Sequence, residues 1–175
     1  MGTKIIGSLG RALKPLPLLL FLLLLAGCHP AAHLGKRAPG FRVRTLAGQT
    51  RTLASYRGRV LILNFWATWC PPCVEEVPSL NRLHQQLHGL PVSILAISID
   101  QDANAYRKFL KSWDIQFNTA RDPSAAIMHR YGTQKIPETY IIDQNGRLRR
   151  KIVSASNWTD PVMVRYLTDL ARGEN

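Results

Sequence analysis

A chain of 175 residues is long enough for one ordinary folded domain, and it shows neither an internal repeat nor a second domain. It carries 23 basic and 11 acidic residues, which gives a formal net charge of +12. Such a charge attracts nucleic acid, anionic lipid or acidic protein partners. It has only three cysteines, so a disulfide framework is excluded as the basis of the fold.

The first residues have the features of a targeting segment. Three basic residues precede an apolar core from Leu16 to Leu25, which is too short to span a bilayer comfortably. The tetrapeptide Leu25-Ala26-Gly27-Cys28 resembles the lipobox of bacterial lipoproteins, which implies cleavage before Cys28 and lipid attachment to this residue. The alternative is an uncleaved N-terminal anchor. Either arrangement places the domain outside the cytoplasm.

These features divide the chain into three parts: a signal peptide over residues 1–27, a lipidated tether over 28–37 and a folded domain over 38–175. Cleavage removes three basic and no acidic residues. The mature chain then has 20 basic residues against 11 acidic ones, a net charge of +9. Nucleic acid is the least accessible partner for an exported lipoprotein, so we expect no nucleic-acid binding.

The domain is predicted to open with a small hairpin. Residues 41–45 and 49–53 flank Gly48 and have the pattern of two short strands. The stretch Val60–Trp66 is apolar except for Asn64, which is typical of a central strand buried on both faces.

Two cysteines, Cys70 and Cys73, follow that strand, and a periodic stretch from Cys73 to about His88 predicts a helix that Pro78 kinks without ending. A strand followed directly by a helix places Cys70 at the helix N-terminus. Free N–H groups and the helix dipole stabilise a thiolate there. Cys70 is therefore the predicted nucleophile, and Cys73, one turn further, is placed to attack a mixed disulfide on Cys70.

Two other interpretations of the cysteine pair are weaker. A zinc site lacks ligands, because the only other cysteine is Cys28 and the histidines lack the usual paired spacing. His84 and His88 are four residues apart, but an exposed helix face explains them and no third ligand is apparent. A purely structural disulfide would close a very small loop and constrain the unfolded chain little. We therefore predict no metal site.

Strands and helices alternate through the rest of the chain, which predicts an α/β fold with a parallel sheet core. The basic run Arg147–Lys151 lies in a predicted edge strand, where a solvated strand face is its commonest explanation. The remaining predicted elements are a strand over 92–99, a helix over 103–113, a short helix over 124–131, a strand over 138–143, a turn over 143–146, a strand over 147–153 and a helix capped by Asp160 with Pro161 at its first position.

Two motifs carry a family resemblance: Trp69-Cys70-Pro71-Pro72-Cys73 after a buried strand, and Ile136-Pro137-Glu138-Thr139 before a late one. Together they resemble the thioredoxin fold and, more narrowly, the TlpA/ResA/CcmG family of membrane-tethered thioredoxin-like proteins. The resemblance covers residues 38–172 and is most specific at Phe65–Cys70. It implies a central mixed sheet flanked by helices, with an N-terminal hairpin and an extra strand and helix inserted after the redox motif.

The resemblance also implies substrate-binding residues. The Ile136–Pro137 bond is expected to be cis and Pro137 to lie beside the two sulphurs, presenting backbone to an extended substrate. Without the resemblance, Pro137 is equally well explained as a proline that begins a strand. Trp69 is expected at the substrate rim, or simply as a shield for the disulfide. Glu138 resembles the CcmG branch and points weakly toward cytochrome c maturation.

Glu76 is the candidate for moving protons. Thioredoxin carries a buried aspartate six residues before its first redox cysteine, whereas this chain has Asn64, which cannot accept the proton. The TlpA/ResA-like branch instead uses a glutamate three residues after the second cysteine, where Glu76 stands. At i+3 from Cys73 it shares that residue's helix face, and Glu75 points elsewhere. The alternative is a solvated glutamate stabilised by the helix dipole.

We therefore expect an extracytoplasmic thiol–disulfide oxidoreductase that is lipid-anchored through Cys28 and reduces disulfides in a restricted set of client proteins. Apocytochrome c or an upstream maturation thioredoxin is the client implied by resemblance. Electrons are expected from a membrane thiol reductase. The chain has no dinucleotide or flavin fingerprint, so the Cys70–Cys73 disulfide is its only expected redox group.

Three other functions could use the same pair of cysteines. A disulfide-forming oxidase differs only in the reduction potential of the pair. A thiol peroxidase is disfavoured, because that family expects threonine or serine where this chain has Ala67. A Cu(I)-binding assembly protein would use both cysteines as soft ligands, but copper chaperones of this fold usually space them by three residues and add a histidine.

Overall fold

The structure is a computed structural model and describes residues 1–2 and 32–174. The predicted signal peptide from residue 3 onward and the lipidated Cys28 lie outside these residues. The elements are β1 (Arg42–Arg44), β2 (Thr50–Thr52), the 3-10 helix η2 (Leu53–Tyr56), β3 (Val60–Trp66), α2 (Pro71–Gln86), β4 (Val92–Ser98), α3 (Ala103–Ser112), β5 (Asn118–Arg121), α4 (Ala126–Arg130), β6 (Glu138–Ile142), β7 (Leu148–Val153) and α5 (Pro161–Arg172).

A five-stranded mixed sheet in the order β5-β4-β3-β6-β7 organises the domain. The central strand β3 is buried along its whole length, as its apolar sequence predicts. It pairs in parallel with β4 and antiparallel with β6. The outer strands β5 and β7 continue the sheet on either side, and β1 and β2 form the predicted separate hairpin.

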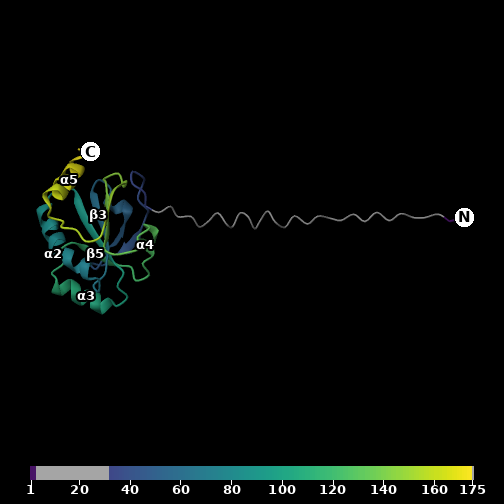
Figure 1. The fold of residues 1–175 in the computed structure, drawn as a ribbon, viewed down its shortest axis with the longest axis horizontal. Coiled ribbons are helices and arrows are strands. Elements are labelled where there is room, and N and C mark those ends of the chain that lie inside the picture. Colours follow the sequence, from purple (N-terminus) through teal and green to yellow (C-terminus); the bar gives the residue numbers. More distant parts are fainter. Residues whose placement is uncertain (3–31, 175) are drawn as a thin grey trace.

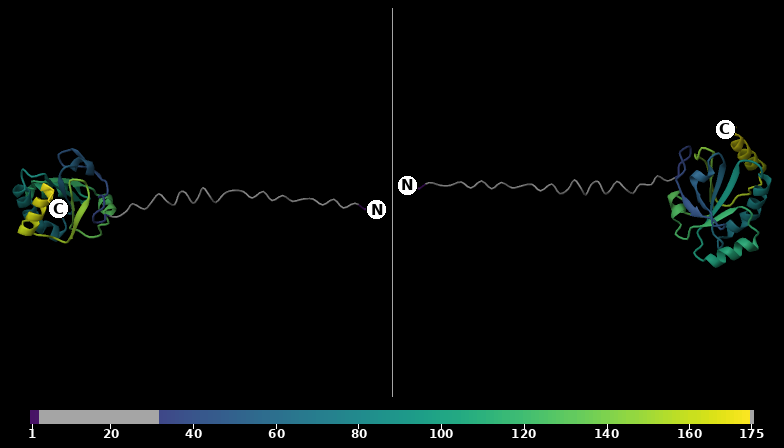
Figure 2. Two further views of the ribbon diagram at one scale, coloured as in Figure 1. Left: turned by 90° about the horizontal axis from the view of Figure 1, so that it is seen from above. Right: turned by 180° about the vertical axis from the view of Figure 1, so that it is seen from behind.

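The sheet is covered on both faces by different elements. One hydrophobic cluster packs α2, α3 and α5 against alternate residues of β3, including Ile62 and Trp66. The other packs the hairpin, η2 and α4 against the intervening residues Leu61, Leu63 and Phe65. Figure 1 shows α2 and α5 on one side of the sheet and α4 on the other, and the rear view in Figure 2 shows the hairpin on the α4 side.

Most of the elements lie where the sequence predicts them. α2 begins at Pro71, two residues earlier than predicted, and continues through Pro78. Asp160 caps α5 by accepting hydrogen bonds from two backbone N–H groups, and Pro161 is the first helical residue. The strand β5 was not predicted as an element, because its sequence Asn-Thr-Ala-Arg has no strong alternation and is only four residues long.

The chain joins the domain beside the start of β7. Gly35 N donates to Leu148 O at 2.7 Å, Leu148 N donates to Lys36 O at 2.9 Å, and Arg37 forms an isolated bridge with Arg147. Residues 35–37, which we assigned to the tether, are thus hydrogen-bonded to the domain. Within residues 32–174 no helix is both long and apolar enough to cross a membrane.

Candidate active site

The two cysteines lie where β3 passes into α2. Cys70 is the N-cap residue of α2 and is 5% exposed, whereas Cys73, inside the first turn, is 1% exposed. They form a disulfide with their Cα atoms 5.3 Å apart, so the structure holds the oxidised form. Pro71 at the first helical position leaves no N–H there to satisfy. The geometry confirms the predicted placement of Cys70 at a helix N-terminus.

Hydrogen bonds to Asp100 hold the segment just before Cys70 in place. The sequence did not lead us to predict a role for Asp100. Both carboxylate oxygens accept from Thr68 N, at 3.0 and 3.3 Å, and one of them accepts from Thr68 Oγ1 at 2.6 Å. Ser98 Oγ donates to the same carboxylate at 2.5 Å. Asp100 directly follows the buried strand β4, and the parallel strands β3 and β4 end at the same edge of the sheet. That pairing is the signal that could have identified it.

Three of the four predicted substrate-binding residues, Trp69, Ile136 and Pro137, lie near Cys70. The Ile136–Pro137 peptide bond is cis, and the Ile136 carbonyl oxygen lies 3.8 Å from Cys70 Sγ. Trp69 is 64% exposed next to the disulfide, whereas Trp66 packs in the core. Cys70 is the less covered of the two sulphur-bearing residues, and the half-buried Ile136 and the exposed Trp69 beside it offer an extended peptide a carbonyl group and an aromatic surface.

Glu76 lies on the buried face of α2, at 3% exposure, and its carboxylate accepts hydrogen bonds from neutral donors. Asn64 Nδ2 donates to Oε1 at 2.7 Å, while Trp158 Nε1 and Ser156 N donate to Oε2 at 3.1 and 3.4 Å. The neighbouring Glu75 is exposed, as predicted. Glu76 is therefore not the solvated first-turn glutamate of the alternative interpretation.

Burial raises the pKa of Glu76 above its ordinary value, because the charged form loses its hydration. The hydrogen bonds from Trp158, Asn64 and Ser156 act in the opposite direction and lower the pKa, but the desolvation is the larger effect. A carboxyl group with a raised pKa exchanges a proton nearer to neutral pH. This is the property that a proton acceptor for a cysteine thiol needs.

A pocket gives Glu76 a route to solvent. It has a volume of about 380 Å³ and lies between α2 and the segment that leads to α5, with Glu75, Arg82 and Asn157 also on its walls. A buried carboxyl group that borders such a pocket can exchange its proton with water without unfolding of the helix. Trp158 and Ser156 reach this site from about 80 residues further along the chain, and no motif in the sequence identifies them.

Glu138 lies on the opposite face of the sheet from Glu76. It is 4% exposed, accepts hydrogen bonds from the hydroxyl groups of Thr133 and Tyr140, and forms an ion pair with Lys151 at 3.0 Å. Its neighbour Thr139 faces the Glu76 side, where Thr139 Oγ1 accepts from Asn64 Nδ2 at 2.9 Å. Glu138 Oε1 thus has three internal partners, and the contact of this residue with a substrate stays a prediction.

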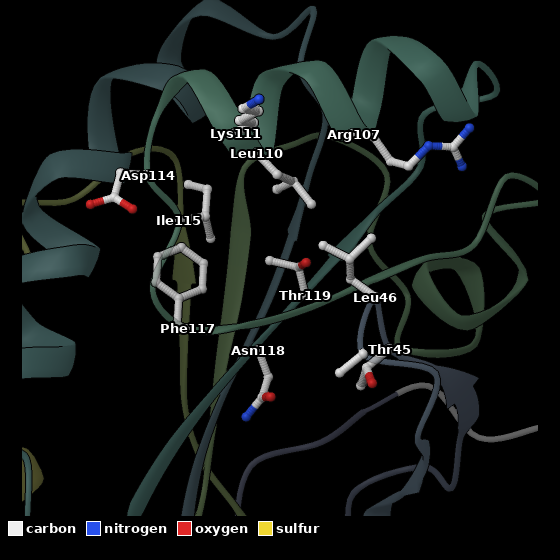
Figure 3. A pocket seen from close by; sticks show the side chains of 11 residues that line it. Thr45, Leu46, Arg107, Leu110, Lys111, Asp114, Ile115, Phe117, Asn118 and Thr119 are labelled. Carbon is white, nitrogen blue, oxygen red and sulfur yellow. The ribbon is translucent and has the colours of Figure 1, made fainter.

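Two other features lie apart from the sulphurs. Within residues 32–174 there is no group of three or more metal-binding side chains, and the helix neighbours His84 and His88 have no third ligand. A cavity of about 430 Å³ between α3 and the edge strand β5 is lined by residues such as Leu110, Phe117 and Arg107 (Figure 3). It contains none of the predicted site residues.

Comparison with known proteins agrees with this geometry. Residues 34–151 match the AhpC/TSA family. The chain is 35% identical over 120 residues to thiol-disulfide oxidoreductase ResA of Bacillus thuringiensis subsp. konkukian, with 69% of each chain covered. It is 32% identical over 130 residues to ResA of Geobacillus thermodenitrificans, covering 74% of this chain and 75% of the relative.

A solved structure from Chlorobium tepidum, assigned as thiol:disulfide interchange protein DsbE, superimposes with a TM-score of 0.70 at 26% identity, covering 82% of this chain and 98% of the other. The fold and the paired cysteines define a thioredoxin-like thiol–disulfide oxidoreductase. The chain belongs to the AhpC/TSA family, and the proteins that it resembles include ResA thiol-disulfide oxidoreductases.

The raised pKa of Glu76 predicts a pH-dependent stability. A raised folded-state pKa means that the contribution of Glu76 is fully present below the ordinary glutamate pKa and is lost as the pH rises through the folded-state value. The free energy of unfolding of the oxidised wild type, minus that of Glu76→Gln, should therefore fall as the pH is raised from about 4 to about 8. Urea denaturation at each pH measures it. The control is Glu75→Gln, which removes an exposed carboxyl group from the same helical turn and leaves the buried site intact. A difference for Glu76→Gln that does not change with pH would show that burial does not perturb this carboxyl group.

Proposed function

We propose that this oxidoreductase works outside the cytoplasm, lipid-anchored through Cys28, and reduces disulfides in a small set of client proteins. One observation carries the proposal: Cys70 lies beside the Ile136 carbonyl group and the exposed Trp69, while Cys73 is almost fully covered and shares its helix face with buried Glu76. The arrangement separates a sulphur that meets a client from a sulphur that resolves the complex.

The first step is attack by the Cys70 thiolate on one sulphur of a client disulfide. A bond forms between Cys70 Sγ and that sulphur, the client S–S bond breaks, and the second client sulphur leaves as a thiolate that takes a proton from water. The helix N-terminus favours the Cys70 thiolate through its free N–H groups and dipole. An extended client would lie along the backbone at Ile136 and Pro137.

The second step needs a thiolate on Cys73, which is buried and away from bulk water. The Cys73 thiol gives its proton to the Glu76 carboxylate, and the resulting thiolate attacks Cys70 Sγ. The mixed disulfide breaks, the Cys70–Cys73 disulfide forms, and the client sulphur leaves as a thiolate that is protonated in turn. Two electrons have then passed from the dithiol to the client. Glu76 returns its proton to water through the pocket beside it.

The resting disulfide must be reduced again before another cycle. A membrane thiol reductase that carries a dithiol would supply the two electrons by the same exchange in reverse. The client class that we propose is apocytochrome c or an upstream maturation thioredoxin, on the basis of the CcmG-like Pro137-Glu138-Thr139 motif.

Trapping tests which cysteine attacks the client. The probe is a peptide in which a C-x-x-C-H sequence, the attachment motif for c-type haem, is closed by its own disulfide. Reduced Cys73→Ser should accumulate a mixed disulfide with the peptide, because the resolving thiol is missing, whereas Cys70→Ser should accumulate none. Non-reducing mass spectrometry distinguishes the two variants. Accumulation on Cys70→Ser instead would reverse the proposed roles.

The reduction potential of the Cys70–Cys73 pair tests the direction of exchange. A reductant is expected near or below about −220 mV, in the range of thioredoxin-like reductants, whereas an oxidase is expected near about −120 mV. Equilibration of the protein with glutathione or dithiothreitol buffers, followed by quantification of the oxidised fraction, gives the value. A potential near the oxidase value would overturn the reductant proposal but leave the exchange chemistry intact.

Lipid labelling tests the anchor. In a bacterial host grown with radioactive palmitate, the wild-type chain should be labelled and shortened, whereas Cys28→Ala should be unlabelled and keep its precursor length. Cys70→Ser is the matched control, because it also removes one cysteine and should be labelled normally. Labelling of Cys28→Ala would mean that lipid is attached elsewhere, and an unlabelled wild type would favour the uncleaved anchor.

A further inference from the structure

Three arginines from separate parts of the chain converge at the end of the sheet where the tether joins the domain. Arg37 precedes β1, Arg57 follows η2, and Arg147 directly precedes β7. Together with Asn145 they line one pocket of about 350 Å³, and all three arginines are exposed. The backbone bridge between Arg37 and Arg147 holds two of them side by side.

None of these three arginines has a carboxylate partner among the described residues. The two ion pairs of residues 32–174 are Arg149 with Asp143, at 3.6 Å, and Lys151 with Glu138. Asp143 is the acidic residue nearest in sequence to the pocket, but its Oδ1 accepts from the backbone N–H groups of Asn145 and Arg147, at 2.9 and 2.8 Å. Its carboxylate is therefore committed to the turn and to Arg149, and the arginine pocket keeps its positive charge.

Backbone contacts hold two of the guanidinium groups in place. Arg57 Nη1 donates to Asn145 O, and Arg147 Nη1 donates to Gly35 O at 3.2 Å. Gly146, at φ +74°, leaves the space that the Arg57 side chain fills, because a Cβ at this position would lie 2.9 Å from Arg57 Nη1. A guanidinium group has five N–H donors, so each of these side chains keeps free donors for an anion.

The arginine pocket and the disulfide lie at opposite ends of the central strands. At one end of the β3–β6 pair, Leu61 faces Ile142 in register, next to Arg57 and the turn that contains Asn145. At the other end, Phe65 faces Glu138, next to Cys70 and Pro137. A seven-residue strand such as β3 is roughly 20 Å long, so the two sites are separated by about the length of the sheet.

We propose that Arg37, Arg57 and Arg147 bind the phosphate groups of anionic membrane lipids and hold this end of the domain against the membrane, with the disulfide facing away from it. Guanidinium forks match phosphate oxygens in geometry and charge. The proposal rests on the membrane anchoring proposed above, because the anchor brings the arginines close enough to the headgroups.

Tether length favours lipid over other anions as the ligand. Eight residues lie between Cys28 and Arg37, and a fully extended chain from one to the other spans at most about 32 Å. Exposed charges act over a Debye length of about 8 Å at physiological salt, and a domain confined by this short tether repeatedly comes within that range of the charged surface. A mature net charge of +9 adds a general attraction to the same surface.

Hydrogen exchange of the full chain in lipid vesicles tests the proposal. The lipidated protein is reconstituted through its anchor at Cys28 into vesicles of phosphatidylcholine, with or without about 30% phosphatidylglycerol, which gives the vesicles a negative surface potential. Amides at 35–37 and 144–148 should exchange more slowly in the anionic vesicles only. Each basic residue near an anionic surface contributes about 1 kcal/mol, so Arg57→Gln/Arg147→Gln should lower the ratio of docked to undocked chain about thirtyfold.

The matched control is Arg107→Gln/Lys111→Gln, which removes the same charge from α3 and should keep the protection. Unchanged exchange of the β3 and β4 amides shows that each variant is folded. Equal protection in both vesicle types, or protection that survives Arg57→Gln/Arg147→Gln, would overturn the proposal. So would equal protection by millimolar inorganic phosphate on neutral vesicles, which would identify a free-phosphate site. Failure of the anchor itself is detected separately by the palmitate labelling.

Discussion

The passage from β3 to α2 is the constraint on which the redox site depends. Only four residues, 67–70, connect a strand buried on both faces to the first residue of the helix. Asp100 fixes this passage through the backbone and hydroxyl of Thr68. Because this connection is short, the packing of the sheet determines the position of Cys70. The sulphur cannot move without disturbing either the central strand or the Asp100 contacts.

Glu76 and Glu138 are buried carboxyl groups on opposite faces of the sheet, and they differ in the charge of their neighbours. Glu138 has a cationic partner, Lys151, so its charge is compensated inside the protein. Glu76 has only neutral donors from Asn64, Ser156 and Trp158, and burial raises its pKa. The replacement of an acidic residue by Asn64 therefore does not remove proton chemistry from this face. It leaves one carboxyl group where two would repel each other.

The sequence predicts the parts of this architecture that are local or strongly patterned. The apolar strand β3, the capped helix α5 and the placement of Cys70 follow from burial, capping and motif spacing. Helix geometry alone predicted that Glu76 shares the face of Cys73 and that Glu75 does not, and Glu76 is buried while Glu75 is exposed. The missed features are contacts across long sequence separations: Trp158 reaches Glu76 from 82 residues away, and β5 becomes a strand only because β4 offers it a partner. No local pattern contains that information.

The separation of the arginine pocket from the disulfide constrains how the proposed cycle meets its two partners. A docked domain presents Cys70 to soluble clients, at a distance from the membrane of about the length of the sheet. A reductase embedded in the membrane could not reach that sulphur in the docked orientation. Re-reduction would then require the domain to leave the lipid surface and rotate, which the chain between Cys28 and Gly35 permits, because it extends to at most about 25 Å. Anionic lipid should consequently slow the reductive half of the cycle more than the transfer to clients, because only the former requires the arginine contacts to break.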